Sequence, residues 1–241
     1  MSSASNQRNL LLLSSSRYCE YGMLEFGEAI IRDFLGDERR ILYLPYAVVI
    51  EDRAGFIQGV QERFTTLGHD LVSVEEMENP LAALNEFDAV AVNGGNTFQL
   101  LHCLHKYQLV NAIRKRVHDG MLYMGWSAGA NVACPTLCTT NDMPIVQPES
   151  FSALNLVPFQ INAHFTDTMP EGHRGETRRM RIEEFLRLNP GKMVIGLPEG
   201  NMLRIHGDSI SAYGEHPLVV FRANETAQEI AVDDDLSFLL S

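Results

Sequence analysis

The chain has few cysteines, and their placement excludes a disulfide-stabilised secreted domain. Four cysteines among 241 residues, Cys19, Cys103, Cys134 and Cys138, are scattered rather than paired, which is typical of proteins from a reducing cytosol. Cys134 and Cys138 stand four positions apart, but no second pair of ligands follows at a spacing that suits zinc. We therefore expect Cys134 and Cys138 to be buried thiols, and no metal site.

Basic residues are also scarce. The chain has 19 Lys and Arg against 31 Asp and Glu, which makes the formal net charge -12. A phosphate backbone or an anionic membrane surface attracts a basic surface, which this balance does not favour. We therefore expect neither nucleic acid nor a membrane as partner, and a small molecule instead.

No run of apolar residues approaches the ~20 that a membrane-spanning helix requires. The first apolar run, Leu10–Leu13, is also too short for the core of a signal peptide, so we expect a cytoplasmic protein. The polar residues 1–8 are predicted to form a flexible tip. Residues 9–241 have a length that one domain with a substantial core commonly reaches.

The order of short apolar runs and longer helical segments predicts an α/β fold with a mostly parallel sheet flanked by helices. Each run is bounded by Gly, Pro, Asp or Ser. The predicted strands are Asn9–Ser14, Arg40–Pro45, Leu71–Val74, Ala89–Asn93 and Met121–Trp126, and the predicted helices are Met23–Leu35, Ala54–Leu67, Thr97–His105 and Gln108–His118.

The pattern loosens after about residue 134, and the polar stretch Asn162–Glu176 is predicted to be irregular, which is more often functional than idle. A helix is predicted over Thr177–Leu188. Short strands then follow, with hairpin-like turns at His206-Gly207-Asp208 and Tyr213-Gly214-Glu215, so we expect antiparallel strands towards the C-terminus. The predicted strands are Met193–Leu197, Met202–Ile205, Ser209–Tyr213, Leu218–Phe221 and Glu229–Val232.

The segment Gly125-Trp126-Ser127-Ala128-Gly129 matches G-x-S-x-G between an apolar run and a small-residue helical start. Small flanking residues allow strand and helix to approach closely, and the strained turn exposes the serine hydroxyl. The helix behind it directs free N–H groups at the reacting centre. The context predicts that Ser127 is a nucleophile rather than part of a structural turn.

A serine nucleophile needs a histidine base and a carboxylate that orients it. Of eight histidines, His164 and His173 lie in the irregular region, and we favour His164 because it follows an apolar run. Several carboxylates are placed suitably, and the residues alone do not separate them: Asp142, Asp167, Glu176 and Glu199.

The glycine-rich turn Asn93-Gly94-Gly95-Asn96 follows a predicted strand and opens a helix. Its backbone N–H groups could approach an anion or form half of an oxyanion hole, although a plain turn is an equal alternative. It is not a dinucleotide fingerprint, because G-x-G-x-x-G is absent.

Taken together, these motifs resemble those of the peptidase E family of serine peptidases, which also contains the cyanophycinases. The resemblance runs from about Asn9 to the C-terminus. The motifs that carry it are Asn93-Gly94-Gly95-Asn96-Thr97, Gly125-Trp126-Ser127-Ala128-Gly129-Ala130-Asn131, Ile161-Asn162-Ala163-His164-Phe165, Glu171-Gly172-His173-Arg174-Gly175-Glu176-Thr177-Arg178 and Pro198-Glu199-Gly200.

The resemblance implies hydrolysis of Asp-X dipeptides through an acyl-enzyme, on a fold like that of class I glutamine amidotransferases and without metal or organic cofactor. It implies that Ser127 is the nucleophile and His164 the base, with the N–H groups of Gly95 and Ala128 as oxyanion hole. Both Asp142 and Glu199 match the family pattern, so both stay candidates for the acid.

An acidic substrate also needs a cation on a protein of net charge -12. Arg178 is our candidate, because a guanidinium can hold a carboxylate in a bidentate fork; the alternative is a solvated arginine.

Two other hypotheses are a cyanophycinase-like β-aspartyl peptidase and a catalytically silent ligand-binding module. An esterase of the α/β-hydrolase type is disfavoured, because Asp142 follows Ser127 too closely. The oligomeric state stays open.

Overall fold

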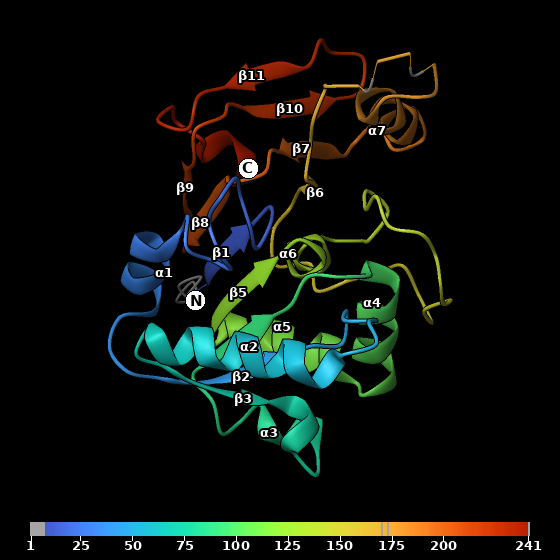
Figure 1. Ribbon diagram of the computed structural model, residues 1–241. Coiled ribbons are helices and arrows are strands. Elements are labelled where there is room, and N and C mark those ends of the chain that lie inside the picture. Colours follow the sequence, from blue (N-terminus) through green and yellow to red (C-terminus); the bar gives the residue numbers. More distant parts are fainter. Residues whose placement is uncertain (1–7, 170, 173, 241) are drawn as a thin grey trace, which may run out of the picture.

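The computed structural model describes residues 8–169, 171–172 and 174–240, which form two β-sheets with helices around them (Figure 1). The strands are β1 Asn9–Leu13, β2 Arg40–Leu44, β3 Asp70–Ser73, β4 Ala89–Val92, β5 Leu122–Trp126, β6 Gln160–Ala163, β7 Met193–Leu197, β8 Met202–His206, β9 Ser209–Tyr213, β10 Leu218–Arg222 and β11 Gln228–Ile230. The helices are α1 Glu28–Leu35, α2 Arg53–Thr66, α3 Pro80–Ala83, α4 Thr97–Lys106, α5 Leu109–His118, α6 Ala128–Ala133 and α7 Arg178–Leu188, with short 3₁₀ turns at Val74–Glu76 and Ser237–Leu240.

The larger sheet has seven strands in the order β3-β2-β4-β5-β1-β8-β9. The five strands from β3 to β1 are mutually parallel, while β8 and β9 add to β1 as an antiparallel edge. The predicted α/β class, with its mostly parallel sheet and later antiparallel strands, is confirmed. The predicted turn at Gly207 does join a hairpin, because His206 of β8 pairs with Ser209 of β9.

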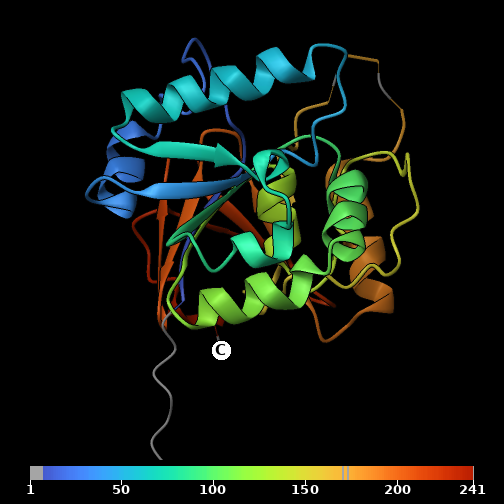
Figure 2. The ribbon, with the colours of Figure 1, turned by 90° about the horizontal axis from the view of Figure 1, so that it is seen from below.

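Strand β1 is buried on both faces, which is why it reads as a continuous run of leucines rather than as an alternating pattern. Leu11 and Leu13 pack with α1 and α2 on one face of the sheet, and Leu10 and Leu12 pack with α4, α5 and α6 on the other. Figure 2 shows α2 and α5 on opposite sides of the strands. This central strand ends at the site described below.

The sequence did not predict the second sheet, which has four strands in the order β11-β10-β7-β6. Strand β9 lies in the larger sheet and β10 in the smaller, so the turn at Tyr213-Gly214-Glu215 is not a hairpin, contrary to our prediction. Apolar residues of β6 and β7 join the same core as α6, and α7 covers the outer face of the second sheet. The two sheets therefore meet at α6.

Two predicted boundaries were also wrong. The first helix begins at Glu28 rather than Met23, because Leu24 has φ of 58° in the left-handed region and interrupts the helical path. The stretch predicted to be irregular from Asn162 begins later, since Asn162 and Ala163 still belong to β6.

Residues 1–7 of the predicted flexible tip, and His173, lie outside the described residues. Arg8, the last residue of that predicted tip, is held in the fold: its guanidinium donates to the carbonyl oxygens of Leu156 at 2.9 Å and Gly207 at 3.2 Å.

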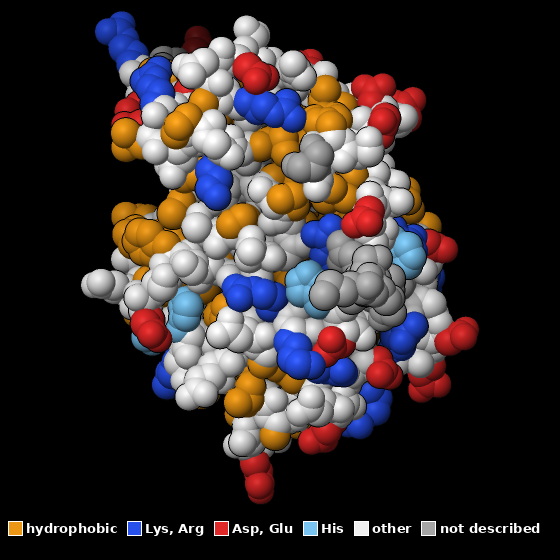
Figure 3. All heavy atoms as spheres, turned by 180° about the vertical axis from the view of Figure 1, so that it is seen from behind, with side chains coloured by type: hydrophobic (Ala, Val, Ile, Leu, Met, Phe, Trp, Pro, Cys, Tyr) orange, Lys and Arg blue, Asp and Glu red, His pale blue; other side chains and the backbone are white. Residues whose placement is uncertain are grey.

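Acidic and basic side chains are interspersed on the face shown in Figure 3. Among the helices of the described residues, none combines the length and the apolar character that crossing a membrane demands.

Candidate active site

Ser127 stands between β5 and α6 in the sharp turn that the sequence predicted. Its φ of 52° and ψ of -110° lie far from helix or strand values, and its N–H donates to the carbonyl oxygen of Leu13 at 3.0 Å. Its neighbours from Leu122 to Ala133 are all buried, whereas Ser127 itself is half-buried. The turn therefore presents the hydroxyl to solvent from an otherwise buried segment.

The glycines of this turn are required by close contacts. A Cβ on Gly125 would lie 2.5 Å from the carbonyl oxygen of Gly129, and a Cβ on Gly129 would lie 2.2 Å from that of Val92. Real Cβ atoms do not approach oxygens so closely, so α6 reaches the sheet only because both positions lack a side chain.

His164 follows β6 and is the histidine that the structure brings to Ser127. Its Nε2 lies 2.8 Å from Ser127 Oγ. The backbone of His164 has φ of 56°, an unfavourable value for a residue with a side chain. Its N–H donates to Ser14 Oγ at 2.8 Å, which helps to hold this conformation.

Glu199 is the carboxylate that reaches the histidine. It lies in the turn after β7, and its Oε1 is 2.8 Å from His164 Nδ1. The side chains of His164 and Glu199 are 34% and 56% exposed, so the pair is accessible from solvent. Ser127, His164 and Glu199 thus form one continuous chain of hydrogen-bonding groups.

Asp142, the other candidate for the acid, is used elsewhere. Its Oδ2 accepts from the N–H of Thr97 at 2.7 Å, from Thr97 Oγ1 at 2.6 Å and from Thr140 Oγ1 at 3.1 Å. Asp142 therefore caps the start of α4. The two remaining carboxylates also have other partners, since Asp167 pairs with Arg179 at 2.5 Å and Glu176 with Arg181 at 3.6 Å.

Ser14 connects the elements of the site, and it was not among the residues predicted from the sequence. Its buried hydroxyl donates to the carbonyl oxygen of Leu197 at 2.8 Å, while accepting from His164 N–H. Leu197 ends β7, two residues before Glu199. A serine directly after the apolar run Leu10–Leu13 was the available signal, because polar residues at the carboxyl end of a central parallel strand commonly belong to a site.

The glycine-rich turn lies beside the serine. Gly95 has φ of 129°, and a Cβ on it would lie 2.3 Å from the carbonyl oxygen of Ala47. A Cβ on the preceding Gly94 would lie 3.0 Å from Ser127 Cβ, which shows how near the two turns are. Ala128 is the first residue of α6, where a backbone N–H has no acceptor within its helix. The Gly94–Gly95 turn and the first residue of α6 therefore both lie next to Ser127.

Arg178 is the first residue of α7 and donates to the carbonyl oxygen of Ala163 at 3.0 Å. With His164, Glu199 and Tyr18 it lines a cavity of about 580 Å³. Burial lowers the pKa of Arg178, and the nearby Glu199 acts in the opposite direction. Arg178 therefore presents a cation beside the His164–Glu199 pair.

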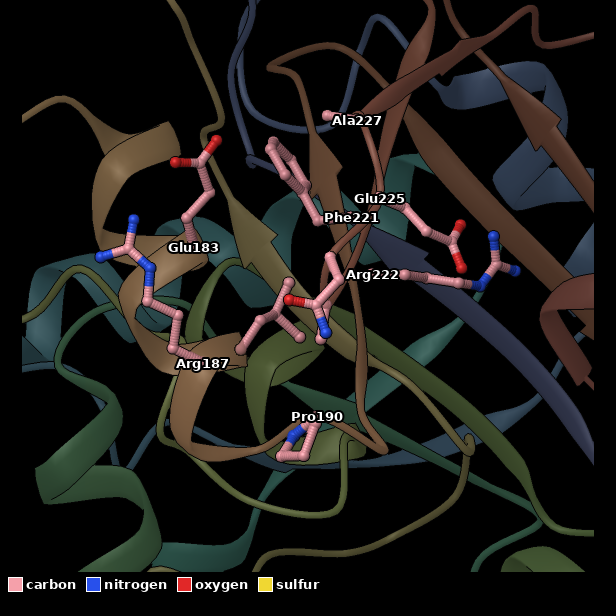
Figure 4. A pocket seen from close by; sticks show the side chains of 10 residues that line it. Glu183, Arg187, Pro190, Phe221, Arg222, Glu225 and Ala227 are labelled. Carbon is pink, nitrogen blue, oxygen red and sulfur yellow. The ribbon is translucent and has the colours of Figure 1, made fainter.

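A further cavity of about 300 Å³ lies between α7 and the β10–β11 hairpin (Figure 4). Glu183 and Arg187 of the helix and Phe221 and Arg222 of β10 contribute to its walls. None of the predicted site residues lines it, so it is separate from the site around Ser127.

The described part of the chain holds no group of three or more His, Cys, Asp or Glu side chains arranged to bind a metal ion. All four cysteines are free. Of the two that we expected to be buried thiols, Cys134 is buried and Cys138 is exposed, so the expectation is confirmed for Cys134 and wrong for Cys138.

Comparison with known proteins identifies the relatives of this chain. The profile of peptidase family S51 matches residues 10–213. Peptidase E from Nostoc sp. is 44% identical over 234 residues, which are 97% of this chain and 97% of that protein. Peptidase E from Shewanella oneidensis is 41% identical over 232 residues, or 96% of this chain and 98% of that protein.

Solved structures of more distant relatives share the fold. A peptidase from an acI-B1 Actinobacterium superimposes with a TM-score of 0.71 at 18% identity, covering 97% of this chain and 99% of that one. A protein from Listeria monocytogenes EGD-e gives a TM-score of 0.66 at 21% identity over 86% of this chain and 98% of its own.

Proposed function

The chain belongs to peptidase family S51, and we propose that it is a serine dipeptidase that hydrolyses dipeptides with a free N-terminal aspartate. The observation that carries this proposal is the chain of contacts from Ser127 Oγ to His164 Nε2 and from His164 Nδ1 to Glu199 Oε1, each 2.8 Å. A serine hydroxyl becomes an effective nucleophile when an oriented base can take its proton.

In the proposed reaction, Ser127 Oγ attacks the carbonyl carbon of the substrate aspartate while His164 Nε2 accepts the hydroxyl proton. The N–H groups of Gly95 and Ala128 stabilise the resulting oxyanion. The C–N bond then breaks, and His164 gives the proton to the leaving amine. Water, deprotonated by His164, then attacks the acyl-enzyme. The ester bond to Ser127 Oγ breaks, aspartate is released, and His164 returns the proton to Oγ.

We assign the orienting acid to Glu199, because an imidazole keeps the correct tautomer when a carboxylate accepts from Nδ1–H. Asp142 is assigned a supporting role instead. Its carboxylate is engaged at the first turn of α4, next to the turn that carries Gly95.

Specificity for aspartate is assigned to Arg178. A cation at the edge of the cavity shared with His164 would pair with the substrate's side-chain carboxylate and offset the repulsion from a protein of net charge -12. The partner is thus a small dipeptide. We place the reaction in the cytoplasm, where free thiols such as the exposed Cys19 and Cys138 persist.

The test is hydrolysis of Asp-Leu, with Leu-Leu, Glu-Leu and β-aspartyl-Leu as controls. We expect turnover of Asp-Leu alone, and a loss of about 10⁵–10⁶-fold in kcat for Ser127→Ala. Arg178→Ala should raise KM for Asp-Leu far more than for a neutral analogue. Equal turnover of Leu-Leu would refute the aspartyl specificity, and full activity of Ser127→Ala would refute the serine mechanism.

A further inference from the structure

A second cavity, of about 570 Å³, opens on the Ser127 side of His164. Ser127, Gly94 and Gly95 are among the residues that line it. Most of its remaining walls are apolar and come from three separate segments of the chain. The apolar lining residues are Ala47, Val48, Val49, Ile50, Phe56, Trp126 and Ile145.

Three of these apolar side chains are unusually exposed. Val49, Ile50 and Ile145 are 59%, 53% and 56% exposed. Large apolar side chains that gather around one cavity, rather than standing singly, are typical of a binding surface. Here the cavity also contains the nucleophile, so an apolar group bound in it would lie within reach of the reacting carbonyl.

Two of these three segments are held by hydrogen bonds. Arg53 donates to the carbonyl oxygens of Val48 and Pro45, both at 3.0 Å, and so fixes the segment that carries Val49 and Ile50. In the segment that carries Ile145, Asn96 Nδ2 donates to the carbonyl oxygen of Met143 at 2.8 Å, two residues before Ile145. The cavity is therefore preformed.

Charge distinguishes this cavity from the one that contains Arg178. Among the described residues that line the Ser127 cavity there is no Lys, Arg, Asp or Glu. The side-chain carboxylate of an aspartate would lose its hydration there without gaining a cation, whereas an apolar side chain would gain contact area. The aspartyl side chain and the second side chain of a dipeptide would thus be bound on different sides of His164.

We propose, resting on the aspartyl dipeptidase function above, that the cavity formed by Val48, Val49, Ile50, Phe56 and Ile145 binds the side chain of the second residue of Asp-X. The enzyme consequently prefers large apolar residues at that position. Val49, Ile50 and Ile145 determine this preference, because they form the exposed walls that such a side chain would cover.

The experiment compares kcat/KM for Asp-Leu and Asp-Ser. We expect Asp-Leu to be favoured about tenfold in the wild type, as is usual when an apolar pocket recognises a few methylene groups. The double variant Val49→Ser/Ile50→Ser, and separately Ile145→Ser, should bring the ratio to within about twofold of unity. Leu188→Ser is the matched control, because Leu188 is 86% exposed and lies outside this cavity; it should leave the ratio unchanged.

The outcomes separate this proposal from the function on which it rests. Hydrolysis of Asp-Leu and Asp-Ser at equal kcat/KM would support the dipeptidase and overturn the apolar subsite. The apolar subsite would also be overturned if the Val49→Ser/Ile50→Ser and Ile145→Ser variants lowered kcat/KM for both substrates equally. If the wild type hydrolysed neither Asp-Leu nor Asp-Ser, the dipeptidase function would be refuted. Calorimetric binding of both dipeptides to Ser127→Ala would then test separately whether the cavity binds an apolar side chain. If Ser127→Ala binds Asp-Leu more tightly than Asp-Ser, and this difference disappears in Ser127→Ala/Val49→Ser/Ile50→Ser, the apolar subsite is supported. Equal binding of the two dipeptides to Ser127→Ala would overturn it.

Discussion

At the scale of single residues, the site depends on which polar side chain lies against which partner. Ser14 illustrates this, because one buried hydroxyl contacts both the segment of His164 and the end of the strand before Glu199. In the sequence, Asp142 and Glu199 matched the family pattern equally well. Their hydrogen-bond partners separate them.

Glu199→Gln should lower kcat by about 10²–10⁴-fold with little change in KM, because an amide cannot stabilise the imidazolium as a carboxylate does. Steady-state kinetics with Asp-Leu measures this. Asp142→Asn is the comparison: we expect less than about a tenfold loss of kcat, together with a lower melting temperature from a weakened cap of α4. If Asp142→Asn lowered kcat more than Glu199→Gln did, Asp142 would be the orienting acid.

At the scale of elements, the two turns that follow β4 and β5 make the site, and each requires glycine for a steric reason. The turn after β4 passes so close to Ala47 that Gly95 cannot carry a side chain. Parallel neighbouring strands end at the same edge, and β4 pairs with β5, so the turn at Gly95 and the turn at Ser127 lie side by side.

Gly95→Ala should therefore reduce kcat by about 10²–10³-fold, the loss typical of an oxyanion-hole donor that is displaced. Gly59→Ala is the matched control, because Gly59 lies in α2 and a Cβ added there would meet no atom within 4 Å. It should keep full activity and gain up to about 1 kcal/mol in stability. Kinetics and thermal unfolding of both variants test this, and an active Gly95→Ala enzyme would contradict the assigned role.

At the scale of the whole molecule, stability should depend on pH through His69, which lines none of the three cavities described above. His69 is 5% exposed, and neither ring nitrogen has a hydrogen-bond partner among the described residues. Burial lowers its pKa, and Arg39 and Arg32 lower it further, against a smaller opposite effect of Glu38. The folded state therefore favours the neutral imidazole.

Because the folded pKa is the lower one, the stabilisation is complete above the unfolded pKa of about 6.5 and is lost as pH falls towards the folded pKa. The free energy of unfolding should drop by at most about 1.4 kcal/mol per pH unit from this group. Urea unfolding between pH 7.5 and 5.5 should show a steeper loss for the wild type than for His69→Gln. His118→Gln, an exposed control, should follow the wild type; parallel curves for all three would remove His69 as the cause.

The sequence by itself determined the α/β class, the positions of most strands along the chain, the turn at Ser127 and the choice of His164, because these depend on local periodicity and on short motifs. It did not reveal the second sheet, since a short strand such as β10 pairs with β7 through contacts that no local pattern encodes. For the same reason it left Asp142 and Glu199 undecided. Glu199 stands 35 positions after His164, and only the parallel pairing of β6 with β7 brings the two together. A motif formed by neighbouring residues can be recognised in the sequence. The partner of a side chain that is distant in the sequence depends on which strands pair, and only the tertiary structure shows this.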